Sequence, residues 1–167
     1  MILLVNDANI LIDLLKADLV ELFFQMEYEF YITDLVANEI LEENADRLET
    51  FVQNGRLIKK TFDFEELSEI QLLEVQHKVL SIPDCSCLHL SKKLSATMLT
   101  GDAALRRIAK QNKIPVHGAL WVFDELVKQD LISCQAAVEK LSYLMTVNVR
   151  LPETECQKRL KKWKKGT

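Results

Sequence analysis

Residues 2–15 read ILLVNDANILIDLL, and this stretch decides how the rest of the chain is interpreted. Its first four residues form an uninterrupted apolar run, which is typical of a strand buried on both faces. From Ala8 onward the apolar residues recur at helical spacing, which predicts a helix. Asp7 therefore stands where a buried strand ends and a helix begins, which is the edge at which open α/β sheets bind ligands.

The composition is that of an ordinary globular protein, and 167 residues suit one domain with a sizeable core. No apolar run approaches the roughly 20 residues that a membrane span needs. The N-terminus lacks the basic segment and the longer apolar run of a signal peptide. We therefore expect a cytoplasmic protein with no membrane association, whose cysteines are reduced thiols.

The net charge of −4 gives no global reason to bind nucleic acid, but the basic residues are unevenly distributed. Residues 157–167 contain six Lys or Arg and no acid. A basic tail on an acidic body can hold a polyanion locally, so Lys161, Lys162 and Lys164 are weak candidates for nucleic-acid contacts. Alternatively, the apolar residues of this segment, Trp163 among them, dock a final helix on the body, and we favour this interpretation.

Short apolar or aromatic strands alternate with helical patterns along the chain. Strands are predicted at 2–5, 28–32, 56–60, 96–99 and 114–116, and helices at 8–15, 33–43, 44–52, 64–80, 81–94, 103–111, 120–128, 133–145 and after Pro152. This alternation predicts an α/β protein, with a three-layer α/β/α architecture around a short-stranded, mostly parallel central sheet. We expect residues 1–130 to form this domain and residues 131–167 to form a helical C-terminal extension packed on it.

Four acids stand at places where an acid needs a reason: Asp7, Glu39, Asp84 and Asp102. Asp7 and Asp102 each follow a predicted strand, and parallel strands would place both at one edge of the sheet. Glu39 falls within the apolar stripe of the helix predicted for 33–43, where an unpaired charge is expensive. Asp84 lies in the first turn of its helix, where the helix dipole favours an acid.

Each of these acids also has a purely structural explanation. Asp7 and Asp102 can be N-caps. Asp84 can complete a capping box with Ser81, and Glu39 can lie at a helix edge paired with a lysine. Taken together, however, carboxylates that converge on one crevice repel each other unless cations neutralise them, and hard oxygen ligands select Mg²⁺ or Mn²⁺. Such a cluster supports metal-assisted attack of water on a phosphodiester.

Four short segments carry these acids in order: VNDANILI at 5–12, VANEI at 36–40, IPD at 82–84 and LTGDAALR at 99–106. With them, the sequence resembles PIN domains over about residues 1–130. The PIN domain is the fold of VapC-type toxin ribonucleases and related metal-dependent nucleases. The segment VHGALWV at 116–122 is similar to the ending of a PIN subgroup related to nucleic-acid-binding proteins.

The resemblance implies a Mg²⁺- or Mn²⁺-dependent endoribonuclease whose substrate is RNA. It assigns metal binding and catalysis to Asp7, Glu39, Asp84 and Asp102, and supporting positions to Asn9 beside the first acid and Thr100 beside the last. Arg106, at the end of the fourth segment, is a weak candidate for contacting RNA. The resemblance further implies the toxin of a toxin–antitoxin pair, with an antitoxin protein that blocks the cleft, and a homodimer or higher oligomer that pairs through helices.

A non-catalytic alternative stays open, in which a PIN fold retains its acids for metal binding or structure and acts through nucleic-acid or protein contacts. An aspartyl phosphatase explains the sequence less well, because it usually needs a second acid at position 9, where this chain has Asn9. A signal receiver needs a lysine after a later strand, and no convincing one is present. Neither of these two classes accounts for Glu39.

Overall fold

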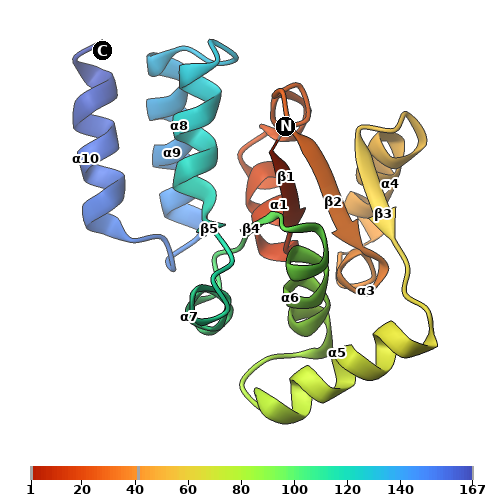
Figure 1. Cartoon of the computed structure of the whole chain (residues 1–167). Coiled ribbons are helices and arrows are strands. Elements are labelled where there is room, and N and C mark those ends of the chain that lie inside the picture. Colours follow the sequence, from red (N-terminus) through yellow and green to blue (C-terminus); the bar gives the residue numbers. More distant parts are fainter. Residues whose placement is uncertain (1, 41, 167) are drawn as a thin grey trace.

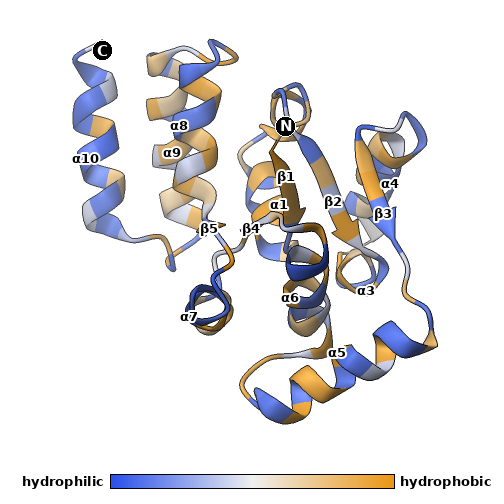
Figure 2. Ribbon diagram, viewed as in Figure 1, coloured by the Kyte–Doolittle hydropathy of each residue, from blue (hydrophilic) through white to orange (hydrophobic). Residues whose placement is uncertain are grey.

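The computed structural model describes residues 2–40 and 42–166, apart from the side chains of residues 42 and 43. The strands in this part of the chain are β1 (Leu3–Asn6), β2 (Glu29–Thr33), β3 (Leu57–Lys60), β4 (Thr97–Leu99) and β5 (Val116–His117). They form one sheet in the order β3-β2-β1-β4-β5, with each neighbouring pair parallel (Figure 1). β1 lies at the centre and is coloured as strongly hydrophobic in Figure 2. Leu4 and Val5 are accordingly fully buried.

Helices connect and cover the strands. Those described are α1 (Ala8–Lys16), α2 (Val20–Phe23), α3 (Asp34–Ala37), α4 (Glu42–Gln53), α5 (Phe64–Gln76), α6 (Ile82–Leu94), α7 (Ala103–Gln111), α8 (Ala119–Lys128), α9 (Cys134–Val147) and α10 (Glu153–Lys164). None of them is both long enough and apolar enough to cross a membrane. α6 packs on β1, β2 and β4 and contacts α7, whereas α1 and α2 contact α8. The connections from β1 to β2 and from β3 to β4 run in opposite directions across the sheet. Because parallel crossovers are right-handed, α1 and α2 cover one face of the sheet, and α6 and α7 cover the other. The predicted three-layer α/β/α architecture is confirmed.

Three neighbouring strands end in residues that cap the following helix. Asp7 follows β1, has an extended backbone and accepts a hydrogen bond from the Ala8 amide at the start of α1. Thr33 ends β2 and caps α3, and Asp102 follows β4 and caps α7. Short polar side chains are preferred at such positions because they satisfy helix amides that have no partner within the helix. The caps therefore gather polar side chains at the carboxyl edge of the sheet.

The helix predicted for 33–43 is wrong beyond its first turn. α3 ends after four residues, and the amides of Glu39 and Ile40 donate to carbonyls three residues earlier. Such bonds tighten and close a helix terminus. Val36 and Ile40 are both buried at a spacing of four, so the hydrophobic pattern alone could not distinguish a continuous helix from a turn. The part of this prediction at residue 41 lies outside the described residues.

Most other boundaries differ from the sequence-based expectation by one or two residues, and two of the differences have an identifiable reason. α5 ends at Gln76 and not at residue 80, because His77 leaves the helical region with φ −125° and ψ 68°. β5 covers Val116–His117, so it begins two residues later and ends one residue later than the predicted strand at 114–116. Pro115 has no amide hydrogen and contributes only its carbonyl, which accepts from the Met98 amide.

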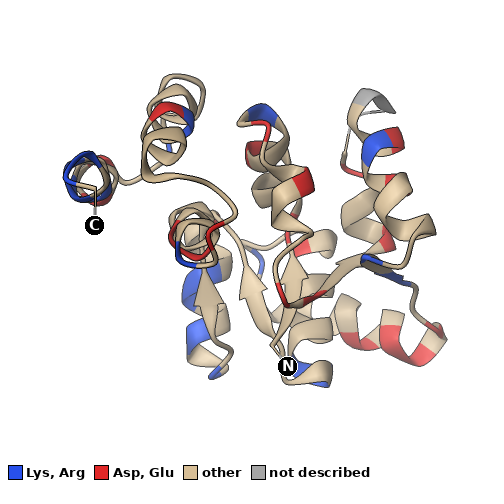
Figure 3. Cartoon of the chain, turned by 90° about the horizontal axis from the view of Figure 1, so that it is seen from above, with Lys and Arg blue, Asp and Glu red and all other residues tan. Residues whose placement is uncertain are grey.

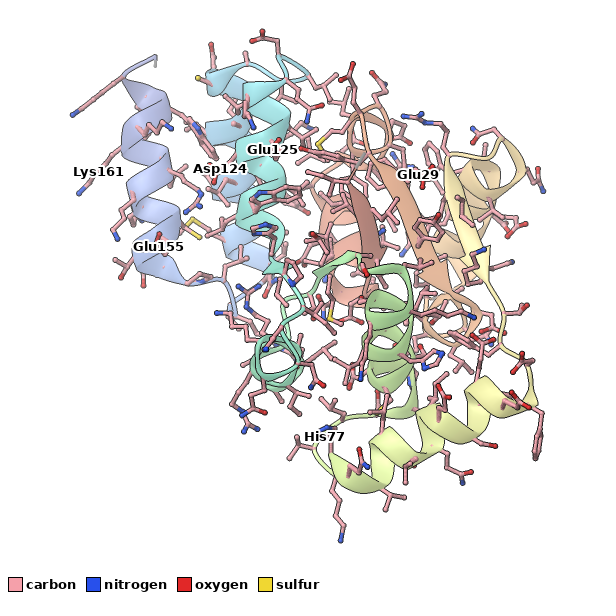
Figure 4. All side chains as sticks on the ribbon, in the orientation of Figure 1. Glu29, His77, Asp124, Glu125, Glu155 and Lys161 are labelled. Carbon is pink, nitrogen blue, oxygen red and sulfur yellow. The ribbon has the colours of Figure 1, made fainter. Side chains whose placement is uncertain are left out.

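The last helix, α10, packs through its apolar side. Leu160 and Trp163 are buried, and the Trp163 ring centroid lies 6.2 Å from that of Phe123 on α8. Arg159 Nε and Nη2 also donate to the carboxylate of Asp124 at 2.7–3.1 Å, between the two helices seen side by side in Figure 4. The Trp163 ring is therefore packed inside the protein and is not available to stack on a base.

Candidate functional site

Asp7 is the central carboxylate at the carboxyl edge of the sheet, and it is only 3% exposed. Its Oδ1 accepts a hydrogen bond from the Ala8 amide at 2.7 Å. Its Oδ2 accepts from Asn9 Nδ2 at 2.6 Å and from Thr100 Oγ1 at 2.7 Å. Three donors from two strand ends thus hold one buried carboxylate in a fixed orientation.

Burial raises the pKa of Asp7 from 3.8 to about 6. The hydrogen bond from Thr100 opposes this shift, and the nearby charges of Asp84 and Asp102 add to it. Among the described residues, no Lys, Arg or His side chain forms an ion pair with Asp7, Asp84 or Asp102. The site therefore carries negative charge that the protein itself does not neutralise.

Asn9 joins the β1–α1 junction, which contains Asp7, to the β4–α7 junction, which contains Gly101. While its amide nitrogen donates to Asp7, its Oδ1 accepts from the Gly101 amide at 2.8 Å. A Cβ atom at Gly101 would lie 3.3 Å from this oxygen, so glycine permits the close approach. Thr100 has a similar double role, because its hydroxyl donates to Asp7 and accepts from the Asp102 amide at 3.0 Å. The structure thus places both predicted supporting residues in contact with Asp7.

Asp84 and Asp102 are helix-capping residues that also face this site. Asp84 Oδ2 accepts from the Ser81 amide at 2.8 Å within a capping box, and Asp102 Oδ1 accepts from the Leu105 amide at 2.7 Å. Among the described residues, the other oxygen of each carboxylate has no protein donor. Capping a helix and binding a ligand are therefore compatible roles for these two acids, because capping holds one carboxylate oxygen and leaves the other oxygen available to a ligand.

Glu39 lies in the turn after α3 and is exposed, so the prediction that it lies buried on an apolar helix stripe is wrong. Its pKa is nevertheless raised, first by partial burial of its carboxyl group and then by the charges of Asp7 and Asp84. Because those two charges act on it, Glu39 lies within electrostatic reach of both. All four predicted acids thus lie around the same edge of the sheet.

A buried contact that the sequence did not indicate ties the Glu39 segment to the Asp84 helix. The hydroxyls of Thr33 and Ser86 share a hydrogen bond of 2.8 Å, and Ser86 is fully buried. It joins the end of β2 to the first turns of α6. The two residues are 53 positions apart, and a lone serine within a helix carries no local signal for such a partner.

The donor chemistry of the four acids fits a hard divalent cation. Among the described residues, no three Asp, Glu, His or Cys side chains lie close enough together to coordinate one ion by themselves. Mg²⁺ keeps several water ligands and commonly binds proteins through one or two carboxylates. The arrangement around Asp7 therefore suits a water-rich ion such as Mg²⁺ or Mn²⁺ better than an ion that needs a closed set of protein ligands.

The basic candidates separate into one near residue and three remote ones. Arg106 is half-buried, and its Nη1 donates to the Thr100 carbonyl at 3.0 Å, directly beside the site. Lys161, Lys162 and Lys164 are exposed on α10, among the blue positions near the C-terminus in Figure 3. Figure 4 places Lys161 on the outer side of this helix. α10 packs on α9, and neither helix carries one of the four acids.

Asp7, Glu39, Asp84 and Asp102, the carboxylate cluster, lie at the carboxyl edge of a parallel sheet between two helical layers. This arrangement defines a recognisable class of α/β protein. A family model described as a PIN domain matches residues 3–165 of this chain. The chain therefore belongs to the PIN domain family.

Among solved structures, the chain is similar to VapBC-1 from nontypeable Haemophilus influenzae. The two are 12% identical with a TM-score of 0.51, over 71% of this chain and 99% of that chain. At this identity the likeness shows a shared fold. No protein in a search of curated proteins matches this chain.

Proposed function

We propose that this protein is a metal-dependent endoribonuclease that hydrolyses RNA phosphodiester bonds. The observation that carries the proposal is the surroundings of Asp7. This carboxylate is buried, the charges of Asp84 and Asp102 help to raise its pKa to about 6, and no described Lys, Arg or His forms an ion pair with it. Such a site gains stability from a bound cation. Membership of the PIN domain family also supports a nuclease function.

In this proposal Asp7, Glu39, Asp84 and Asp102 hold Mg²⁺ or Mn²⁺. When bound, the metal would supply activation of water and neutralisation of charge on the phosphodiester. Asn9 and Thr100 fix the orientation of Asp7 through their hydrogen bonds. The helix caps fix Asp84 and Asp102 in the same way, so the chain holds its acids in position before any ligand arrives.

The test is cleavage of a mixed set of structured and single-stranded RNAs by the purified protein with Mg²⁺, Mn²⁺ or EDTA. Asp7→Asn and Asp102→Asn are assayed beside Asp46→Asn, a matched control at an exposed acid on α4. We expect metal-dependent cleavage by the wild type and the control, and none by the two site variants, whose folding is checked by circular dichroism. Cleavage that survives in EDTA or in both site variants would contradict the proposal.

The same preparation distinguishes the non-catalytic alternative. Calorimetric titration with Mn²⁺ measures whether the acids bind metal without any reaction. Metal binding that Asp7→Asn removes, together with RNA binding and no cleavage of any RNA, would favour a PIN-fold binding module. This alternative draws support from the capping roles of the acids, which alone would justify their presence in the fold.

We also propose that the protein is the toxin of a toxin–antitoxin pair, acts in the cytoplasm and is blocked by an antitoxin protein. The fold shared with the VapBC-1 structure and the sequence resemblance to VapC-type toxins support this proposal. Induced expression of the wild type in bacteria should arrest growth, whereas expression of Asp7→Asn should not. Equal growth with both proteins would contradict the toxin assignment.

A homodimer or higher oligomer is a further proposal, and α5 offers the surface that supports it. Several large apolar side chains of this helix are exposed and share one face: Phe64, Leu67, Leu72 and Val75. Contiguous exposed apolar side chains commonly mark a protein contact. Size-exclusion chromatography with light scattering measures the mass, and a monomer at all concentrations would contradict the proposal.

Finally, we propose that residues 131–167 are an extension of the domain formed by residues 1–130. Asn148 Nδ2 donates to Asp13 Oδ2 on α1 at 2.8 Å, and Lys140 Nζ donates to the Ala17 carbonyl at 3.0 Å. Both bonds cross from the extension to the first helix of the chain. A single unfolding transition by calorimetry and by fluorescence would support this assignment, and two separate transitions would contradict it.

A further inference from the structure

A cavity of about 710 Å³ lies next to the carboxylate cluster. Its walls come from α1, α7, α10, the end of β5 with the start of α8, and residues 147–152 at the end of α9 and in its connection to α10. Asn9 and Gly101, which are hydrogen-bonded to each other beside Asp7, also line it. None of the four acids is in the cavity wall, but Asn9 is, and it donates to Asp7, so the cavity adjoins the candidate site. Its volume falls in the range of about 300–1,000 Å³ found for ligand pockets.

The cavity carries an excess of positive charge although the whole chain is at −4. The charged residues in its wall are Lys16, Arg106, Arg150, Arg159, Asp13 and Glu155, which is four cationic groups against two acids. Asp13 is buried and accepts a hydrogen bond from Asn148, and Arg159 is paired with Asp124 outside the cavity wall. Among the side chains that the structure describes, no carboxylate lies at ion-pair distance from Lys16, Arg106 or Arg150.

The rest of the wall combines these cations with aromatic rings. His117 and Trp121 line the cavity with their rings stacked at 4.5 Å between centroids and 6° between planes. Trp121 also stacks against Tyr28 at 5.8 Å, which keeps the rings in a fixed position. Proteins that hold single-stranded nucleic acid combine cationic groups along the backbone with aromatic groups beside the bases.

We propose that this cavity binds the single-stranded RNA segment that adjoins the scissile phosphate. Arg106, Arg150 and Lys16 neutralise its phosphates, and the proposal rests on the proposed ribonuclease function. RNA is favoured over an acidic peptide because Asn9 in the cavity wall is hydrogen-bonded to Asp7, one of the acids proposed to act on a phosphodiester. Since Arg150 belongs to residues 131–167, the C-terminal extension contributes to substrate binding as well as to packing.

The test measures RNA binding without metal, so that no cleavage occurs. A short, fluorescently labelled single-stranded RNA is titrated with the full-length protein in EDTA at several salt concentrations. Lys16→Gln and Arg150→Gln are compared with Lys78→Gln, a matched loss of one exposed positive charge outside the cavity. We expect the first two to raise Kd about threefold to tenfold and to lower the salt slope by about 0.7 for each lost phosphate contact. Lys78→Gln should change neither quantity.

Equal Kd values for all three variants would overturn the cavity assignment, and so would absence of RNA binding by the wild type. Tight binding of a labelled polyglutamate peptide, lost in Lys16→Gln and Arg150→Gln while RNA binding is unaffected, would assign the cavity to an acidic protein partner instead. Metal-dependent cleavage with unchanged Kd values would leave the nuclease standing and overturn only this inference. The expected losses of binding without any cleavage would support the cavity and overturn the nuclease.

Discussion

Thr100 Oγ1 donates a hydrogen bond of 2.7 Å to Asp7 Oδ2, across 93 positions of the sequence. The same hydroxyl oxygen accepts from the Asp102 amide at 3.0 Å. One buried threonine therefore fixes the end of β1 relative to the start of α7, and with them two of the four candidate acids. Because it links both junctions, its removal tests the organisation of the site.

Replacing Thr100 by valine keeps the shape of the side chain and removes the hydroxyl. The Asp102 amide and Asp7 each lose a partner, so we expect the free energy of unfolding to fall by about 1–3 kcal/mol. The pKa of Asp7 should rise further, because the Thr100 hydrogen bond lowers it in the wild type. Urea denaturation and carbon NMR of the aspartate carboxyls measure these changes. Thr100→Ser, which retains the hydroxyl, should remain close to the wild type, and an unchanged Asp7 pKa in the valine variant would contradict the argument.

Asp7→Asn should remove activity and change how the stability of the metal-free protein depends on pH. The pKa of Asp7 is about 6 in the folded protein, above the ordinary value of 3.8 that applies to the unfolded chain. The stability that protonated Asp7 provides is therefore complete below pH 3.8 and is lost as the pH rises through 6. The amide cannot accept all three hydrogen bonds of the carboxylate, which costs the variant stability at every pH. Relative to the wild type, however, we expect the variant to gain about 1–3 kcal/mol as the pH rises from about 4 to about 7. Denaturation in EDTA across this pH range measures it. A stability difference that does not change with pH would count against the raised pKa.

Glu66→Gln probes the link between α5 and α6 with the opposite pH dependence. Lys93, and then the Asp63 amide, lower the pKa of Glu66 from 4.5 to about 2. A lowered folded-state pKa adds stability that is present above 4.5 and is lost as the pH falls towards 2. The variant should therefore melt at a lower temperature at neutral pH, and this difference should narrow below pH 4.5. Gln can still accept the capping hydrogen bond from the Asp63 amide, so the comparison isolates the effect of the charge. A difference in melting temperature that does not change with pH would contradict the lowered pKa of Glu66.

Trp163→Ala tests whether α10 is a structural part of the domain. Trp163 is 3% exposed and packs near Phe123, so its truncation should lower the free energy of unfolding by about 3–5 kcal/mol. Lys162→Ala, at an exposed neighbouring position, should have little effect. Chemical denaturation of both variants measures this. A Trp163→Ala protein as stable as the wild type would mean that the ring does not dock in solution.

The sequence was sufficient for features that depend on neighbouring residues. The apolar run before Asp7 and the helical spacing after it predicted β1 and α1, and the capping box of Ser81 and Asp84 is present as expected. Glu39 shows where this reasoning fails. Its predicted burial rested on a helical period over a few residues, and the structure has a turn there that buries the same apolar neighbours.

The sequence by itself determined the strands, the caps and the order of the four acids, because hydrophobic periodicity and capping chemistry act within a few residues. Only the tertiary structure decided which distant groups meet. How the parallel strands and crossing helices pack decides the contacts of Thr100 with Asp7 and of Ser86 with Thr33. The same packing places Lys16 and Arg150 in the wall of one cavity. No local pattern encodes these contacts, since the free energy that holds them comes from burial of the whole core.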